Sequence, residues 1–225
     1  MHKRISLKFI TLAFTACVAL LATAACEGPG RTPTRGVYML IDTSGTYTKE
    51  IEEAQQIISY LLARLNPGDS LAVARIDTAS FSEKDIIAKT TFESRPSVAN
   101  QQKRRFVEEV QKFVNTAEPS AYTDITGGTL QAIGWLNEKN PDHKIILIFS
   151  DMKEDLPEGY VRDIALPLVG YEVIALNVTK LRSDNIDPRE YLNRLASWEQ
   201  KVEDGGGEFR VINDLERLEN ILPTY

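Results

Sequence analysis

Beyond residue 36 the sequence alternates between short, nearly continuous apolar runs and longer segments whose apolar residues recur at helical spacing. Apolar runs bounded by polar turn residues are typical of strands that are buried on both faces, as in a parallel sheet. Segments with an apolar residue every three or four positions predict helices that cover such a sheet. The alternation therefore predicts an α/β protein, with a doubly wound sheet and helices on both of its faces.

The apolar runs predict a six-stranded, mostly parallel sheet with strands at 37–41, 71–76, 86–92, 144–149, 171–178 and 209–212. Only nine residues, 77–85, separate the second run from the third. Parallel strands need a crossover of about a dozen residues or more, so the third strand should be antiparallel and lie at an edge. Helical spacing predicts helices at 51–65, 106–114, 127–137, 188–202 and 215–222. One domain, residues 36–225, accounts for all of these elements.

The first 25 residues predict an export signal. Three basic residues precede position 9, and residues 9–25 contain no charge. The small residues 23–25 come directly before Cys26 and resemble the lipobox of bacterial lipoproteins, where a diacylglyceryl group is attached to the Cys and the preceding segment is removed. The resemblance implies that Cys26 is lipidated. An ordinary signal peptide cut near Ala25 and an uncleaved N-terminal anchor are the alternatives.

Residues 26–35 are polar with Gly and Pro, which predicts a short tether between the lipid and the domain. Lipidation implies a protein of the bacterial cell envelope that is membrane-anchored and faces the periplasm. Glu27 follows Cys26, whereas Asp at this position is associated with inner-membrane retention in enteric bacteria, so the outer membrane is slightly favoured. Removal of residues 1–25 changes the formal charge from −6 to −9. An acidic surface argues against nucleic acid as a partner.

Polar residues follow two of the predicted strands at the point where each strand ends. Residues 42–46, Asp-Thr-Ser-Gly-Thr, follow the first strand, and Ser150 and Asp151 follow the strand at 144–149. In doubly wound sheets the ligand site lies beyond the carboxyl ends of the strands, where the strand order reverses. Both strand ends thus predict a site that combines carboxylates with hydroxyls.

These segments resemble the metal-ion-dependent adhesion site (MIDAS) of von Willebrand factor A (vWA) domains. That site uses an Asp-x-Ser-x-Ser turn after the first strand, a Thr in a later loop and an Asp after the fourth strand. The matching residues in this sequence are Asp42, Ser44, Thr46, Thr123 and Asp151. Thr46 replaces the last Ser but keeps the hydroxyl, and Met152 stands where many members have Gly. The resemblance covers roughly residues 36–225.

An all-oxygen ligand set suits a hard divalent cation, here Mg²⁺ with Mn²⁺ or Ca²⁺ as alternatives. The resemblance implies a non-enzymatic binding module that captures an Asp or Glu of a partner protein through this cation. A metal-assisted hydrolase and a structural subunit with a vestigial metal site are the alternatives. His143 is the sole histidine after residue 25 and should lie at the opposite end of its strand, so no general base is expected at the site.

Several other residues have structural explanations. Thr123 and Asp124 taken alone would more often be helix caps, and Thr126 and Thr129 are predicted to be caps rather than ligands. The two tryptophans, at positions 135 and 198, lie at helical spacing among apolar residues, which predicts core positions.

Overall fold

The computed structural model describes residues 32–44, 51–77, 82–178, 181, 184, 186–214, 219, 221 and 222. All the elements below belong to one compact unit, Pro33–Tyr225. The predicted signal segment, Cys26 and Thr46 lie outside the described residues, as does most of the predicted helix at 215–222. None of the helices in these ranges is long and apolar enough to cross a membrane.

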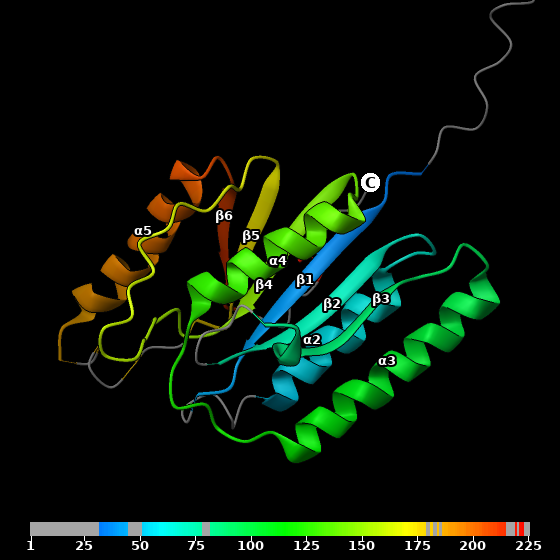
Figure 1. Cartoon of the computed structure of the whole chain (residues 1–225), viewed down its shortest axis with the longest axis horizontal. Coiled ribbons are helices and arrows are strands. Elements are labelled where there is room, and N and C mark those ends of the chain that lie inside the picture. The colour runs from blue at the N-terminus through cyan, green and yellow to red at the C-terminus, as the bar shows by residue number, and fades with distance from the viewer. Residues whose placement is uncertain are drawn as a thin grey trace, which may run out of the picture. The chain divides into compact units, whose positions relative to one another are not determined.

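The described residues form a six-stranded sheet and four α-helices, as shown in Figure 1. The strands are β1 (Arg35–Asp42), β2 (Ser70–Ile76), β3 (Ile86–Thr91), β4 (His143–Phe149), β5 (Tyr171–Leu176) and β6 (Glu208–Ile212). The helices are α2 (Ile51–Arg64), α3 (Pro96–Thr116), α4 (Ile125–Lys139) and α5 (Pro188–Asp204).

The strand order is β3-β2-β1-β4-β5-β6. β3 pairs with β2 in antiparallel orientation at the edge of the sheet, and all other pairs are parallel. The predicted mostly parallel sheet with one antiparallel edge strand is therefore confirmed. The chain passes from β1 outward to β2 and β3 and then returns to β4 on the other side of β1. The strand order consequently reverses between β1 and β4.

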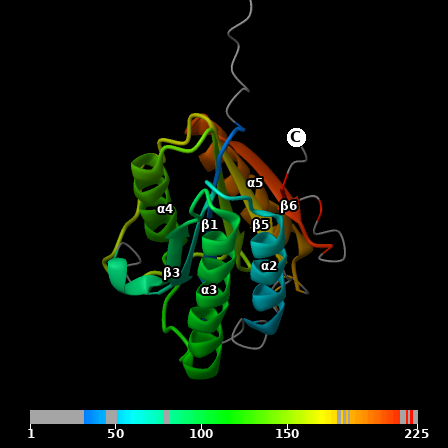
Figure 2. The same cartoon turned by 90° about the vertical axis from the view of Figure 1, so that its right-hand side faces the viewer.

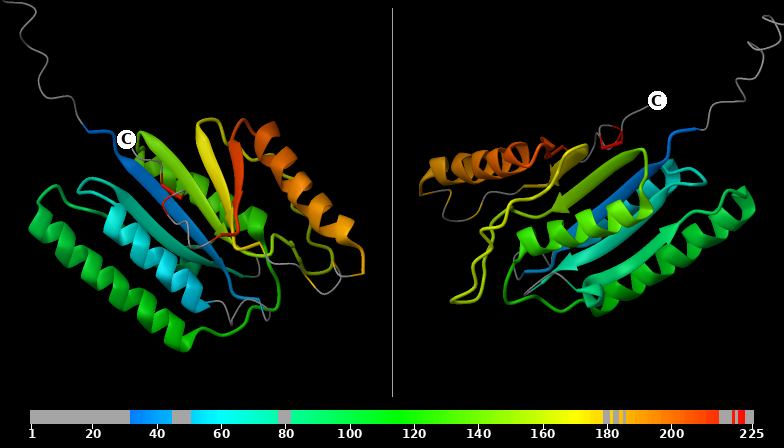
Figure 3. Two further views of the ribbon diagram at one scale, coloured as in Figure 1. Left: turned by 180° about the vertical axis from the view of Figure 1, so that it is seen from behind. Right: turned by 45° about the horizontal axis from the view of Figure 1, so that its top comes forward.

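Alternate residues of β1 enter two separate cores. Val37, Met39 and Ile41 pack against α2 and α3, whereas Tyr38 and Leu40 pack against α4 and α5. Figures 2 and 3 show these helix pairs on opposite sides of the sheet. A strand that is buried on both faces has no polar alternation, and this explains the continuous apolar runs in the sequence. Trp135 and Trp198 lie in the α4–α5 core, as predicted.

Two features differ from the pattern that the sequence suggests. α3 begins at Pro96, ten residues before the first apolar residue of the predicted helix at 106–114. Residues 96–105 are mostly polar, so apolar spacing did not reveal these turns, although proline at the first helical position favours a helix start. The connection between β4 and β5, residues 150–170, contains no helix. Leu166 and Leu168 of this connection are buried in the α4–α5 core.

Candidate metal centre

The two predicted carboxylate ligands lie at the carboxyl ends of adjacent strands. Asp42 ends β1, and Asp151 follows the end of β4 by two residues. Asp42 is 1% exposed and Asp151 is 5% exposed. The hydroxyl of Ser150 donates a hydrogen bond of 2.8 Å to Oδ2 of Asp42, across the point where the strand order reverses. The structure thus brings both carboxylates to the switch point that the sheet topology favours for a ligand.

The turn after β1 is held by the Asp42 carboxylate. Its Oδ1 accepts a 2.8 Å hydrogen bond from the backbone N–H of Ser44, and the Ser44 side chain also hydrogen-bonds to it. The carbonyl oxygen of Thr43 accepts a 2.8 Å hydrogen bond from the N–H of Ser120. Ser44 and Ser120 form an isolated parallel bridge. This bridge joins the turn after β1 to the loop that carries Thr123.

Thr123 lies in the loop before α4 and is 4% exposed. Its backbone N–H donates to the carbonyl oxygen of Asp155 at 2.7 Å, and the N–H of Asp155 donates back at 3.0 Å. The segment after β4 therefore fixes the Thr123 backbone.

The surroundings of Asp42 and Asp151 disfavour the ionised form of both carboxylates when no cation is bound. Burial raises the pKa of Asp42, against the effect of hydrogen bonds from Ser44 and Ser150. Burial also raises the pKa of Asp151, and the negative charge of Asp42 raises it further, while Arg194 and Lys153 oppose this rise. A buried carboxylate without a compensating charge is costly. A cation between the two would remove that cost.

The donor set fits a hard divalent cation. Among the described residues, no group of three or more His, Cys, Asp or Glu side chains is arranged to hold a metal ion. A site built from the predicted ligands contains two carboxylates, with hydroxyls as the remaining protein ligands. Oxygen ligands with few charges suit Mg²⁺, which usually keeps several waters.

The polar residues around the start of α4 have structural roles. Asp124 is the N-cap and accepts a 2.8 Å hydrogen bond from the N–H of Gly127, as predicted for a cap. The expectation that Thr126 and Thr129 cap the helix is wrong. Thr126 donates its N–H and hydroxyl to Glu154, and Thr129 donates its hydroxyl to Ile125 within the helix. Asp124 already caps α4, and Thr126 lies within the first turn, where it binds Glu154 of the loop after β4.

The sequence analysis assigned no role at the site to three residues that the structure places near it. Arg162 forms a bidentate ion pair with Asp124, whose side chain is fully buried. Arg194 and Trp198, both on α5, donate hydrogen bonds to the backbone that follows β4. Each lies 38 to 46 residues along the chain from its partner. No local pattern identifies such contacts, because the loops and helix packing that create them are set by the tertiary fold.

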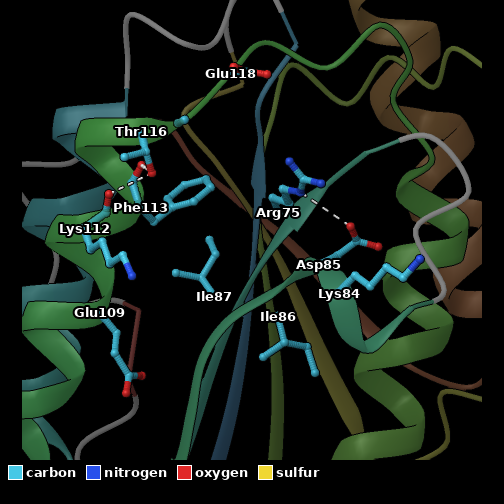
Figure 4. A pocket seen from close by; sticks show the side chains of 11 residues that line it. Arg75, Lys84, Asp85, Ile86, Ile87, Glu109, Lys112, Phe113, Thr116 and Glu118 are labelled. Atoms are coloured by element: carbon cyan, nitrogen blue, oxygen red, sulfur yellow. Dashed lines mark hydrogen bonds and ion pairs between the residues drawn. The ribbon is translucent and has the colours of Figure 1, made fainter.

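A cavity of about 370 Å³ lies at the β3 edge of the sheet, between β3 and α3 (Figure 4). Figure 4 shows Phe113 of α3 and Ile87 of β3 in its lining, with the Arg75–Asp85 ion pair on the other side. Neither Asp42 nor Asp151 lines this cavity. Arg75 also pairs with Asp77, which accepts a hydrogen bond from Ser120. The cavity is thus linked to the site's loops but does not contain the carboxylates.

No protein-family model matches the sequence, and no curated protein sequence matches it. Solved structures do match. A pilus adhesin, SpaC, from Lactobacillus rhamnosus GG has a TM-score of 0.53 at 10% identity, over 84% of this chain and 29% of that one. A von Willebrand factor type A protein from Catenulispora acidiphila has a TM-score of 0.52 at 13% identity, over 84% of this chain and 41% of that one. The fold is that of a vWA domain.

The minor pilin PilB from Streptococcus sanguinis also matches, with a TM-score of 0.51 at 12% identity, over 86% of this chain and 60% of that one. The chain therefore spans between 29% and 60% of the length of these three proteins. Sequence identities of 10% to 13% support a shared fold and nothing further. In the vWA-like fold of this chain, Asp42 ends β1 and Asp151 follows β4, and the strand order reverses between these two strands.

Proposed function

We propose that this protein is a lipid-anchored, metal-dependent protein-binding module of the bacterial cell envelope. It captures an Asp or Glu side chain of a partner protein through a divalent cation. The observation that carries the proposal is the pair of buried carboxylates, Asp42 and Asp151, at the switch point of a vWA-like sheet. Two of the structural neighbours are named as a pilus adhesin and a minor pilin, and a binding role agrees with those names.

The residues that would hold the cation are Asp42, Ser44, Thr46, Thr123 and Asp151. When bound, the cation supplies a positive charge with exchangeable water positions, to which a partner's carboxylate can bind. Hydrogen bonds within the chain orient the proposed ligands. Ser150 and the Ser44 backbone fix the Asp42 carboxylate, and the backbone of Asp155 fixes Thr123.

Exposed apolar side chains in two segments of the chain support a protein as the ligand. Most of the exposed large hydrophobic side chains lie in the β4–β5 connection or around the start of α5, and these are Tyr160, Val161, Ile164, Val169, Ile186 and Leu192. Tyr160 stacks on Arg162, which binds Asp124 directly after Thr123. Exposed apolar side chains that lie together are typical of protein–protein interaction sites.

Among the described residues, no histidine lies at the site to serve as the general base of a hydrolase. His143 begins β4, whereas Asp151 follows the end of that strand, so the imidazole lies at the far end of the sheet. A metal-assisted hydrolase would need a group within hydrogen-bond reach of the attacking water. The structural-subunit alternative predicts no cation binding at all, and metal titration therefore distinguishes it from the proposal.

Lipid anchoring rests on Cys26 and the export-type segment before it. We expect the full chain, expressed in bacteria, to carry a fatty acyl group and a Cys26→Ser variant to carry none, because the variant has no acceptor for the lipid. The measurement is mass spectrometry of the protein extracted from the membrane fraction. A parent protein without an acyl group would contradict lipid anchoring and favour an ordinary signal peptide or an uncleaved apolar anchor.

Partner capture should depend on both the cation and Asp42. We expect crosslinked partner proteins to be recovered with the full chain in Mg²⁺ or Mn²⁺, and to be lost with EDTA or with Asp42→Asn. The same partner proteins should be recovered with the Asp187→Asn variant, because Asp187 caps α5 and is not part of the site. Equal recovery of partner proteins with Asp42→Asn and with the parent would contradict the proposal.

A further inference from the structure

The segment that carries Asp151 is held by two side chains of α5. Nε of Arg194 donates a 2.9 Å hydrogen bond to the carbonyl oxygen of Asp151. Nε1 of Trp198 donates a 2.8 Å hydrogen bond to the carbonyl oxygen of Met152. Residues four apart on a helix lie on the same face, so one face of α5 holds two consecutive carbonyl groups after β4.

Met152 has a backbone conformation that few residues adopt without support. Its φ is 62°, in the left-handed region that favours glycine. The Met152 side chain is 1% exposed and belongs to the α4–α5 core. Its N–H donates a 3.0 Å hydrogen bond to the Ser150 hydroxyl. Hydrogen bonds to the surrounding carbonyls therefore help to hold a strained turn directly beside a proposed ligand.

Arg194 is itself fixed. Its guanidinium forms two hydrogen bonds to the carboxylate of Asp184, at 3.2 and 2.9 Å. The Asp184 carboxylate is fully buried and also accepts a 2.8 Å hydrogen bond from the N–H of Leu181. A bidentate Arg–carboxylate pair has little rotational freedom. The Arg194 Nε–H therefore approaches the Asp151 carbonyl in one orientation.

We propose that Arg194 and Trp198 are positioning residues for the Asp151 carboxylate. They fix the Asp151–Met152 backbone, so that the carboxylate faces Asp42 and Thr123 before the cation arrives. This role rests on the proposed cation site. Groups that orient a metal ligand typically change metal affinity about 10–100-fold when they are removed.

The test uses conservative changes in the full-length protein. Trp198→Phe keeps an aromatic ring in the core and removes the N–H, and Arg194→Lys keeps the charge opposite Asp184 and removes the planar Nε–H. Trp135→Phe is the matched control, because both indoles are 6% exposed but Nε1 of Trp135 has no hydrogen-bond partner among the described residues. Mn²⁺ affinity is measured by electron paramagnetic resonance, and circular dichroism checks the fold of each variant.

We expect Trp198→Phe and Arg194→Lys to bind Mn²⁺ about 10-fold more weakly than the parent, and Trp135→Phe to bind as the parent does. In Trp135→Phe, the emission of the remaining Trp198 should change on Mn²⁺ addition, since its indole N–H contacts the Asp151 segment. Parent-like Mn²⁺ affinity in both Trp198→Phe and Arg194→Lys would overturn the positioning role while leaving the cation site intact. A parent protein that binds no Mn²⁺ would overturn the cation site, and the positioning role with it.

Discussion

Replacement of Arg162 by Met should lower the free energy of unfolding by about 3 kcal/mol. The Asp124 carboxylate is completely buried and faces the Arg162 guanidinium, with Nη2 to Oδ2 at 2.7 Å and Nε to Oδ2 at 3.1 Å. Only 16% of the Arg162 side chain is exposed, so solvent screens the pair weakly. Removal of the Arg162 guanidinium leaves a buried negative charge, and the Gly127 N–H is the donor that still contacts it from α4.

Urea denaturation measures this effect, and two variants control for it. Asp124→Asn in the Arg162→Met background should restore most of the lost stability, because the buried charge is removed as well. Arg189→Met removes an exposed ion pair with Asp187, where the Arg189 side chain is 82% exposed, and should change stability far less than Arg162→Met does. A change below about 1 kcal/mol in Arg162→Met would contradict this account of the pair.

The sheet could be predicted because its physical cause is local. Strands that are buried on both faces must be apolar throughout, and the nine residues between the second and third strands cannot form a parallel crossover. The early turns of α3 could not be predicted from apolar spacing, since residues 96–105 contribute little to the core. The helix there depends on Pro96 at its start and on the apolar contacts of its later turns.

The site was predictable to the extent that strand ends define it. Asp42 and Asp151 end runs that the sequence marks as buried strands, and the sheet order then brings them together. The contacts that orient them were not predictable. Ser150 bonds to a residue 108 positions away, and Arg162 and Arg194 approach from a loop and a helix whose paths depend on the whole fold. Thr46 stays a prediction, because it lies outside the described residues.

Removal of the Asp42 carboxylate should abolish cation binding while the fold is kept. Loss of a group that only orients a ligand costs about 10–100-fold in affinity, so loss of a charged ligand should cost about 100-fold or more. Burial raises the pKa of Asp42, which means that the ionised carboxylate is disfavoured in the cation-free protein. Asn is neutral and similar in shape, so Asp42→Asn should be at least as stable as the parent without metal.

The same pKa shifts predict how binding depends on pH. Burial raises the pKa values of Asp42 and Asp151, so protons compete with the cation over a range that extends above the ordinary carboxyl value. In the cation-free protein, a raised folded-state pKa makes stability fall as the pH rises through it. Cation binding requires the ionised carboxylates, and its affinity, measured by titration at several pH values, should therefore fall as the pH is lowered toward these raised pKa values.

The most direct test of the cation site is calorimetric titration of Mg²⁺ and Mn²⁺ into EDTA-treated protein, with Asp42→Asn measured beside it. We expect the parent to bind one divalent cation per chain and Asp42→Asn to show no saturable binding. The two proteins should have the same circular dichroism spectrum. Equal binding by the two proteins would place the cation elsewhere. No binding by the folded parent would contradict the metal-dependent function and favour a structural subunit.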